Sequence, residues 1–204
     1  MTLNSQTKSL ISKLIYVARY KAMLYSVAPK KVLFKFLSAF TNVKNESNSL
    51  LPTLYNGLGS IKVGSRVVLG VINSPFYLNG YNYIEARSKG ARVVIEDGVQ
   101  INNNFVCIAD QTEIIISENT LVGFNVQIFD SNFHDLDPNN RHKPDPNPKP
   151  VFIGKNVFIG SNVTILKGVI IGDNSTVGSG SVVTRSIPAN CVAAGNPVKC
   201  FESK

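Results

Sequence analysis

One short stretch, "IFDSNFHDLDPNN" at residues 128–140, concentrates the side chains best suited to chemistry. It contains His134, one of two histidines in the 204-residue chain, with Asp130, Asp135 and Asp137 within four residues of it. An imidazole can take up and release a proton near neutral pH, and a neighbouring carboxylate or carbonyl can fix which ring nitrogen carries the hydrogen. A lone histidine is also often a solvated loop residue. The meaning of this stretch therefore depends on the elements that position it.

Basic charge is concentrated at the N-terminus. Residues 1–45 contain eight lysine or arginine residues and no acidic residue, whereas residues 46–204 contain 13 of each sign. The formal net charge of +8 therefore belongs to the first segment, where an electrostatic partner is expected. A hydrophobic content of 44% is typical of a globular protein, and the N-terminus lacks the pattern of a signal peptide. The odd count and unrelated spacings of the cysteines favour free thiols in a reducing cytoplasm over disulfides or a zinc site: Cys107, Cys191 and Cys200.

Apolar residues in the basic segment recur at spacings of three and four, which predicts amphipathic helices. The first apolar face comprises Ile11, Leu14, Ile15, Ala18, Ala22 and Tyr25. Pro29 is expected to end this first helix. A second short helix is predicted from Lys30, with one apolar face formed by Leu33, Phe36, Leu37 and Phe40. Three partners suit these faces: the body of the protein or a neighbouring subunit, an anionic membrane surface and, least well, nucleic acid, for which no recognition motif is present.

The polar, turn-rich segment 41–53 is predicted to be a linker, so that residues 1–50 form an arm and linker and residues 51–204 the main domain. Within the main domain the sequence repeats every six residues. Aliphatic side chains recur without a slip at Ile153, Ile159, Ile165, Ile171, Val177 and Val183. Small or β-branched residues follow four positions later at Val157, Val163, Val169, Ser175 and Ser181.

The same period continues upstream, at Ile95 and Ile101 and again at Ile116, Val122 and Ile128, after a small insertion near 107–115. A six-residue repeat is a signature of a β-helix, in which one strand and one turn together take six residues. A sandwich would instead show strands every ~8–12 residues with an alternation of two. The sequence therefore predicts an all-β repeat whose aliphatic side chains stack along one axis.

The segment "IGKNVFIGSNVTILKGVIIGDNSTVGSGSVVTRSIPANCVAAGNPVKCF" resembles the C-terminal half of hexapeptide-repeat acyltransferases. The likeness is to the branch of maltose and galactoside acetyltransferases and polysaccharide O-acetyltransferases, for which the closing "IPANCVAAGNPVK" is especially typical. It covers about residues 60–200 and leaves the arm outside it. The resemblance implies a left-handed parallel β-helix shaped as a three-sided prism. It also implies a homotrimer that binds acetyl-CoA in the cleft between neighbouring prisms, and a long loop that carries the active-site histidine.

A loop of that kind is visible in the sequence itself. Residues 130–150 break the repeat and contain five prolines. By the resemblance, His134 is the catalytic residue: it would accept the proton of an acceptor hydroxyl during attack on the thioester and return it to the leaving thiolate, with no acyl-enzyme. Asp135, Asp137 or a backbone carbonyl would orient the ring, and the sequence does not choose among them. His142 is interpreted as a solvated loop residue.

The resemblance also implies which residues bind the two substrates. Gly160, Ser161, Ser179 and Thr184 would lie along the pantetheine of CoA, with Arg185 and Lys199 near its phosphates. Phe158, at the cofactor edge, stands where the family commonly has tryptophan. The acceptor sugar is assigned to Asn103, Asp110 and Asp130. An ordinary turn residue of the repeat is the alternative at each of these positions, and no metal site is expected.

These features predict an acetyl-CoA-dependent O-acetyltransferase that acts on a saccharide. The long loop favours a bacterial surface polysaccharide, or its lipid-linked precursor, as the acceptor, and the basic arm fits a cytoplasmic enzyme held peripherally at the inner face of a membrane. Two alternatives stay open: N-acetylation of an amino sugar nucleotide or another small acceptor, and a non-catalytic β-helix scaffold. A zinc-dependent hydratase of the β-helix type is disfavoured, because two histidines on one loop are a poor source of three zinc ligands.

Overall fold

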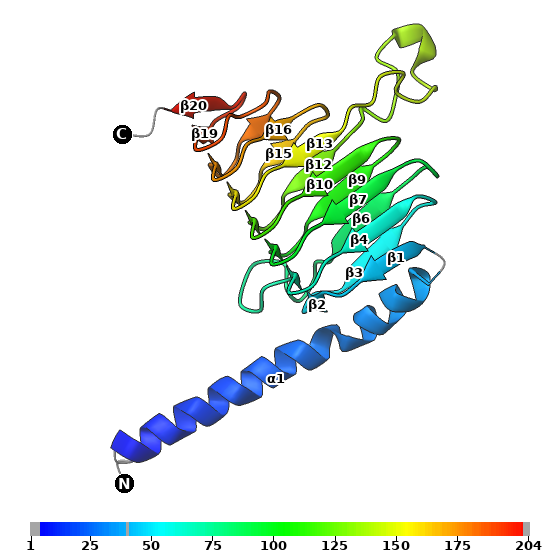
Figure 1. The fold of residues 1–204 in the computed structure, drawn as a ribbon. Helices are drawn as coiled ribbons and strands as arrows, with labels where there is room; N and C mark the ends of the chain where they lie inside the picture. Colours follow the sequence, from blue (N-terminus) through cyan, green and yellow to red (C-terminus); the bar gives the residue numbers. More distant parts are fainter. Residues whose placement is uncertain (1–4, 40, 202–204) are drawn as a thin grey trace.

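The computed structural model describes residues 5–39 and 41–201, and shows one long helix laid across the end of a tall stack of strands (Figure 1). Phe40, which the sequence placed on an apolar helical face, lies outside the described residues.

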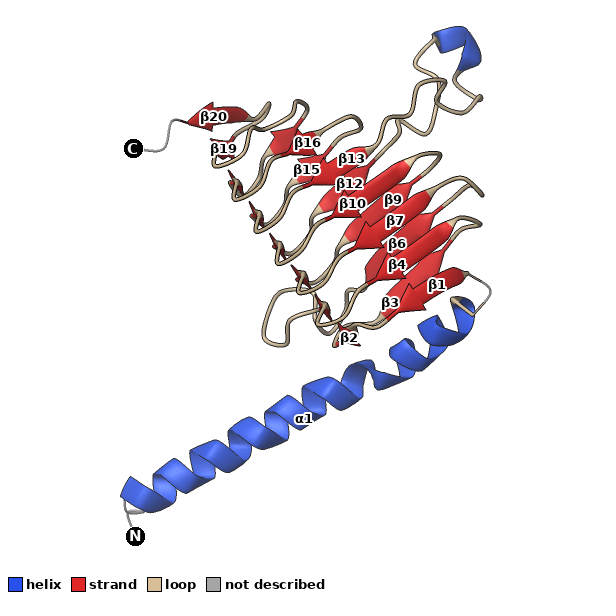
Figure 2. Cartoon of the chain, viewed as in Figure 1, coloured by secondary structure: helices blue, strands red, loops and turns tan. Residues whose placement is uncertain are grey.

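The strands form three sheets, one for each side of a prism, and the chain visits the sheets in turn (Figure 2). The first sheet contains β1 (Asn42–Asn45), β4 (Ser60–Val63), β7 (Arg92–Ile95), β10 (Glu113–Ile116), β13 (Val151–Ile153) and β16 (Ile170–Ile171). The second contains β2 (Asn48–Ser49), β5 (Val68–Leu69), β8 (Gln100–Ile101), β11 (Leu121–Val122), β14 (Phe158–Ile159), β17 (Thr176–Val177), β19 (Val192–Ala194) and β20 (Lys199–Phe201). The third contains β3 (Thr53–Asn56), β6 (Asn82–Ala86), β9 (Val106–Ala109), β12 (Gln127–Phe129), β15 (Thr164–Ile165) and β18 (Val182–Val183). Among these strands, all neighbours are parallel except β19 and β20.

The predicted six-residue repeat forms the core. All six aliphatic side chains from Ile153 to Val183 are at most 1% exposed, and the residues four positions after them are equally buried. Each coil therefore places its aliphatic side chains on those of the coil below, and burial of each such side chain contributes about 1.5–3 kcal/mol. The ladders continue upstream through Ile95, Ile101, Ile116, Val122 and Ile128, as the sequence predicted.

The corners of the prism are sharp because asparagine and glycine occupy them. Asn156, Asn162 and Asn174 have left-handed backbones with φ between 54° and 58°, a conformation that asparagine tolerates better than most residues. Side-chain amides of stacked corners bond to one another, for example Asn156 Nδ2 to Asn174 Oδ1 at 3.0 Å. At Gly160, an added Cβ would lie 2.6 Å from the amide nitrogen of Ser179 on the next coil. Glycine is therefore required there by the close approach of two backbones.

A long insertion interrupts the stack without disturbing its register. Paired residues of the first sheet are 18 positions apart in the regular part, as Phe152 and Ile170 are, but Ile114 and Val151 pair across 37 positions. The difference is the segment 130–150, which leaves the prism between β12 and β13 (Figure 1). We call the corner between the third and first sheets, which follows β6, β9, β12, β15 and β18, the loop edge.

The N-terminal arm is one helix rather than the two expected. Helix α1 runs over Ser5–Leu37 with Pro29 inside it. Proline removes one helical hydrogen bond, but the helix is held on both sides of this position because Val27 and Phe34 pack against the prism and are 3% and 9% exposed. Packing against the prism therefore outweighs the helix-breaking preference of Pro29. No helix in the described part of the chain is long and apolar enough to cross a membrane.

The segment 41–53 is not a linker but the first coil of the prism. Strands β1 and β2 pair with β4 and β5 in the parallel sheets. The polar composition suggested a linker because β1 and β2 begin their sheets and have a strand neighbour on one side only, so their side chains are exposed or half-buried. Leu51 closes the coil: it is fully buried in a small cluster with Val27, Ile72 and Tyr77 that joins α1 to the prism.

Candidate active site

His134 lies exposed near the start of the protruding loop, and its ring is held by the backbone. Its Nδ1 is 2.9 Å from the carbonyl oxygen of Arg141, seven residues along the same loop. A carbonyl can only accept, so Nδ1 carries a hydrogen, and in the neutral tautomer that this contact selects the free lone pair is on Nε2. Of the orienting groups that the sequence left open, the backbone carbonyl is the one that contacts the ring.

Asp135 and Asp137, named as catalytic on sequence grounds, shape the loop instead of contacting the ring by a hydrogen bond. Asp135 Oδ1 accepts from the amide of Asp137 at 2.9 Å. Asp137 caps the short 3-10 helix η1 (Pro138–Asn140), where its Oδ1 accepts from the Asn139 amide at 3.0 Å and its Oδ2 from the Asn140 side chain at 3.1 Å. Both carboxylates therefore fold the turn that brings the Arg141 carbonyl to His134.

A buried carboxylate at the far end of the loop anchors it to the prism. Asp145 is 4% exposed; its Oδ2 is 2.5 Å from Lys167 Nζ on the next coil and accepts from the Asn132 amide at 2.8 Å. Burial alone would raise the pKa of Asp145, but hydrogen bonds from the Asn132 and Asn147 amides and the charge of Lys167 lower it to about 2. The carboxylate therefore stays ionised and joins both ends of the loop to the prism.

The residue before His134 is clamped between aromatic and cationic groups. The Phe133 ring meets Phe129 edge-on at 5.5 Å between centroids, and the Arg87 guanidinium lies 4.9 Å above it. Arg87 is fixed in turn by a two-pronged contact with Glu85, at 3.1 Å for each oxygen, and by Asp110 at 3.3 Å. Phe133 has a φ of 65°, a left-handed backbone unusual for an aromatic residue. This bend turns the chain immediately before His134.

The three residues assigned to the acceptor sugar are all bonded within the protein, and two of them hold backbone. Asp130 is fully buried and accepts from the amides of Asp110 and Thr112 at 2.7 Å each and from the Thr112 hydroxyl at 2.8 Å. Asn103 is fully buried, with its amide bonded to the backbone of the loop that begins at Val71. Neither has an exposed polar atom to offer a sugar, so both are left out of the acceptor site. Asp110 is 7% exposed and already bonded to Arg87 and Ser131.

The residues assigned to CoA fall on two corners and one face of the prism. Gly160, Ser161 and Ser179 lie together between the second and third sheets, where the Ser161 amide donates to Ser179 Oγ at 3.2 Å. Thr184 and Arg185 follow β18 at the loop edge and are exposed. On the second sheet, Phe158 is 49% exposed and Lys199 begins β20. A single copy therefore does not gather these residues around His134.

Several residues that build the site gave no sequence signal of their own. Arg87, Asp145 and Lys167 come from three different coils, and only the stacking of those coils brings them to the loop edge. The Arg141 contribution is a carbonyl, which every residue carries. The one available hint was the acid in "PDPNP", the only acidic residue between Pro138 and Pro150.

Comparisons with known proteins agree with this architecture. Residues 150–185 match the family model described as "Hexapeptide repeat of succinyl-transferase". "Putative acetyltransferase YJL218W" of Saccharomyces cerevisiae is 37% identical over 163 residues, which are 78% of this chain and 78% of that protein. The galactoside O-acetyltransferase of Lactococcus lactis subsp. lactis is 37% identical over 126 residues, which are 62% of this chain and 56% of that enzyme. The match thus spans little more than half of the Lactococcus enzyme.

Solved structures share the fold. A hexapeptide-repeat acetyltransferase of Vibrio cholerae superposes with a TM-score of 0.54 at 21% identity, over 90% of this chain and 91% of that one. PerB of Caulobacter crescentus, solved with CoA and GDP-perosamine, superposes with a TM-score of 0.51 at 18% identity. The superposition covers 77% of this chain and 58% of PerB. The left-handed parallel β-helix with an N-terminal helix is thereby confirmed. Because the yeast relative is 37% identical across more than two thirds of its own length, this chain belongs to the hexapeptide-repeat acetyltransferase family.

Proposed function

We propose that this acetyltransferase moves an acetyl group from acetyl-CoA to a hydroxyl group of a saccharide, with His134 as the general base. The observation that carries the proposal is the 2.9 Å contact between His134 Nδ1 and the Arg141 carbonyl. In the neutral imidazole this contact places the ring hydrogen on Nδ1 and the free lone pair on Nε2 of an exposed side chain, which is the arrangement that a general base needs. The contact of Arg87 with the Phe133 ring holds the residue before His134 and so supports the position of the imidazole.

The chemistry follows from that geometry. The acceptor hydroxyl oxygen attacks the thioester carbonyl carbon while Nε2 of His134 takes the hydroxyl proton. The tetrahedral intermediate then releases the CoA thiolate as the carbon–sulfur bond breaks, and the imidazolium returns the proton to sulfur. No acyl-enzyme forms, because holding both substrates together already supplies the orientation. Backbone N–H groups near the thioester oxygen would stabilise the developing negative charge.

The CoA site is proposed to lie between copies of the chain. Gly160, Ser161 and Ser179 occupy one corner of the prism, whereas His134 leaves from the loop edge. A site that uses both sets requires the corners of two adjacent prisms. This separation supports a homotrimer with three equivalent sites. Phe158 of one face would flank the cofactor, Thr184 would lie along its pantetheine, and Arg185 and Lys199 would be available to its phosphates.

The acceptor is proposed to be a bacterial surface polysaccharide or its lipid-linked precursor, modified in the cytoplasm or at the inner face of the membrane. The Lactococcus lactis relative is named as a galactoside O-acetyltransferase, which supports a sugar hydroxyl as the nucleophile. The exposed position of His134 on a loop that protrudes from the prism suits an acceptor larger than a free sugar.

The test is free-thiol release from acetyl-CoA in the presence of the surface polysaccharide of the source organism. His134→Gln keeps the size of the side chain but removes its base, and His142→Gln, on the same exposed loop, is the matched control. We expect His134→Gln to lower kcat by about 10²–10⁴-fold and His142→Gln to act as wild type.

Three outcomes separate the alternatives. Equal turnover by His134→Gln and wild type removes His134 from the mechanism. Thiol release with amino sugar nucleotides but not with the polysaccharide favours N-acetylation, a possibility suggested by the GDP-perosamine complex of PerB. Absence of thiol release with every acceptor, together with absence of acetyl-CoA binding by calorimetry, favours a non-catalytic scaffold.

A further inference from the structure

Helix α1 presents exposed apolar side chains on one side, which we call the outward stripe, from Leu10 to Phe36. At about 3.6 residues per turn, side chains spaced by four, seven or 11 positions lie on the same side of a helix. The outward stripe follows these spacings and consists of Leu10, Leu14, Tyr25, Val32 and Phe36. Each is between 61% and 72% exposed. This outward stripe lies opposite the side that packs on the prism, so α1 is apolar on two sides and only one of them is covered.

Basic side chains border the outward stripe. At about 100° per residue, Lys21 lies between Leu10 and Leu14 in projection along the helix, Lys35 lies about 20° outside Leu10, and Arg19 lies about 100° beyond Phe36 on the other flank. Residues 1–45 contain no acidic residue, and none of the ion pairs in the described part of the chain involves these three side chains. The remaining lysines of the helix centre are used internally: Lys31 Nζ donates to the Ser49 carbonyl at 2.6 Å, and Lys30 lies 4.9 Å from the Tyr81 ring centre.

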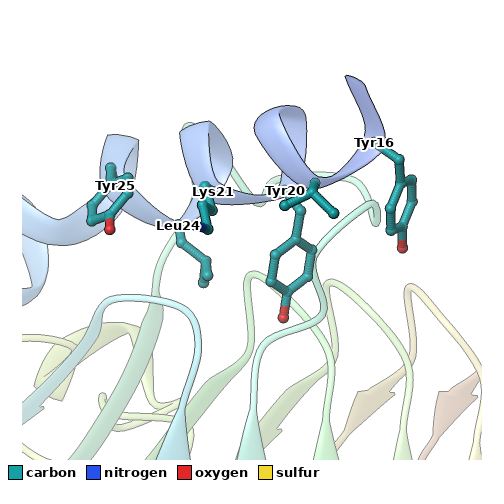
Figure 3. Close-up of a pocket in the computed structure, with 6 residues that line it drawn as sticks. Tyr16, Tyr20, Lys21, Leu24 and Tyr25 are labelled. Atoms are coloured by element: carbon teal, nitrogen blue, oxygen red, sulfur yellow. The ribbon is translucent and has the colours of Figure 1, made fainter. Parts of the chain in front are cut away.

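Three tyrosines lie in the central part of α1. Tyr16, Tyr20 and Tyr25 line, with Val17, Lys21 and Leu24, an open hollow of about 540 Å³ along α1 (Figure 3). Tyrosine and lysine are the residues that occupy the boundary between lipid chains and water, because each has an apolar stem and a polar tip. Tyr25 belongs to the outward stripe and is placed as expected at such a boundary, whereas Tyr16 and Tyr20 point towards the prism (Figure 3).

We propose that α1 lies in the plane of an anionic membrane, with the outward stripe inserted among the lipids and the prism held above the surface. The helix is about 50 Å long at ~1.5 Å per residue, and its basic borders would meet anionic headgroups. A second copy of the helix is a poor occupant, because two such helices would bring basic borders together with no acidic side chain between them. The proposal concerns an interaction surface and does not depend on the proposed reaction.

The test is co-flotation of the full chain with lipid vesicles, either phosphatidylcholine alone or phosphatidylcholine mixed with phosphatidylglycerol. The stripe variant carries Leu14→Gln, Tyr25→Gln and Phe36→Gln, and the charge variant carries Arg19→Gln, Lys21→Gln and Lys35→Gln. Glutamine keeps the helix, since its intrinsic preference for the helix is good. A control variant places the same kinds of change on the exposed surface of the prism: Leu58→Gln, Lys62→Gln and Lys89→Gln.

We expect the wild type to float with the mixed vesicles and to be released by salt. The charge variant should bind roughly 100-fold more weakly, at about fivefold per basic residue. The stripe variant should bind at least about 100-fold more weakly, and the control variant should bind as wild type. The proposal is overturned by a wild type that stays in solution with mixed vesicles, or by a stripe variant that floats unchanged. It is equally overturned if the stripe variant dissociates an assembly in light scattering, because a second copy would then cover the stripe.

Discussion

The anchoring of the loop by Asp145 gives a quantitative prediction. Asp145→Asn keeps the shape of the side chain but removes its charge, and with it the contact to Lys167 at 2.5 Å and the charge-assisted bond from the Asn132 amide. The pKa of Asp145 falls from its ordinary value of 3.8 to about 2 in the fold. At 1.36 kcal/mol per pKa unit, the ionised carboxylate contributes about 2.5 kcal/mol.

The loop can open without unfolding the prism, so this free energy should be sought in local opening. We expect amide hydrogen exchange in residues 130–150 to show an opening equilibrium about fiftyfold more favourable in Asp145→Asn than in wild type. Glu118→Gln is the matched control, because Glu118 pairs with Lys155 at 3.2 Å with both side chains about half exposed. An exposed pair of this kind contributes only ~0–1 kcal/mol.

The dependence on pH supplies a second check with a definite sign. The folded pKa of Asp145 lies below its ordinary value, so its contribution is fully present above about pH 4 and is lost as the pH falls towards 2. Wild type and Asp145→Asn should therefore converge at low pH. The account of the anchor is wrong if the two exchange equally at neutral pH, or if their difference is the same at pH 2 as at pH 7.

Three further changes test other parts of the structure. Gly160→Ala places a Cβ 2.6 Å from the Ser179 amide nitrogen and should lower the free energy of unfolding, measured in urea, by about 1–3 kcal/mol. Gly90→Ala is the control: its Cβ would have open space around it, and it should change the free energy of unfolding by less than about 0.5 kcal/mol. Ile159→Ala removes a fully buried side chain of the aliphatic ladder and should lower the same quantity by about 2–5 kcal/mol. Arg87→Lys loses the two-pronged contact with Glu85 and should lower kcat while leaving the KM for acetyl-CoA unchanged; an equal change in both would contradict a role in holding the loop.

The repeat was predictable because every coil places its residues in the same environment. A position that faces the axis in one coil faces it in the next. The six aliphatic residues from Ile153 to Val183 are therefore six independent indications of the same inward-facing position. The N-terminal part offered no such redundancy. Pro29 and the polar segment 41–53 were judged from local signals alone, and in both places packing against the prism decided the outcome.

The site was predictable only where it interrupts the repeat. The proline-rich break identified the loop and directed attention to His134, but residue type misled at Asn103 and Asp130, whose polar atoms hold backbone instead of facing solvent. The orienting group of His134 is a main-chain carbonyl, and side-chain identities carry no information about it. Contacts such as Asp145 to Lys167, 22 positions apart, exist only once the coils are stacked in register.

The placement of buried charge points to the loop edge as the functional region. In the described part of the chain the interior of the prism is aliphatic, yet four carboxylates are less than 9% exposed: Glu85, Asp110, Asp130 and Asp145. All four lie at the loop edge, and each is bonded to a backbone amide, a cation or a hydroxyl there. Burying a carboxylate destabilises the fold unless such partners satisfy it. A regular coil needs none of them, since the corner after β18 turns without a buried acid. Their shared result is a fixed path for residues 130–134, which ends at His134, so the polar network is best explained as the support of that imidazole.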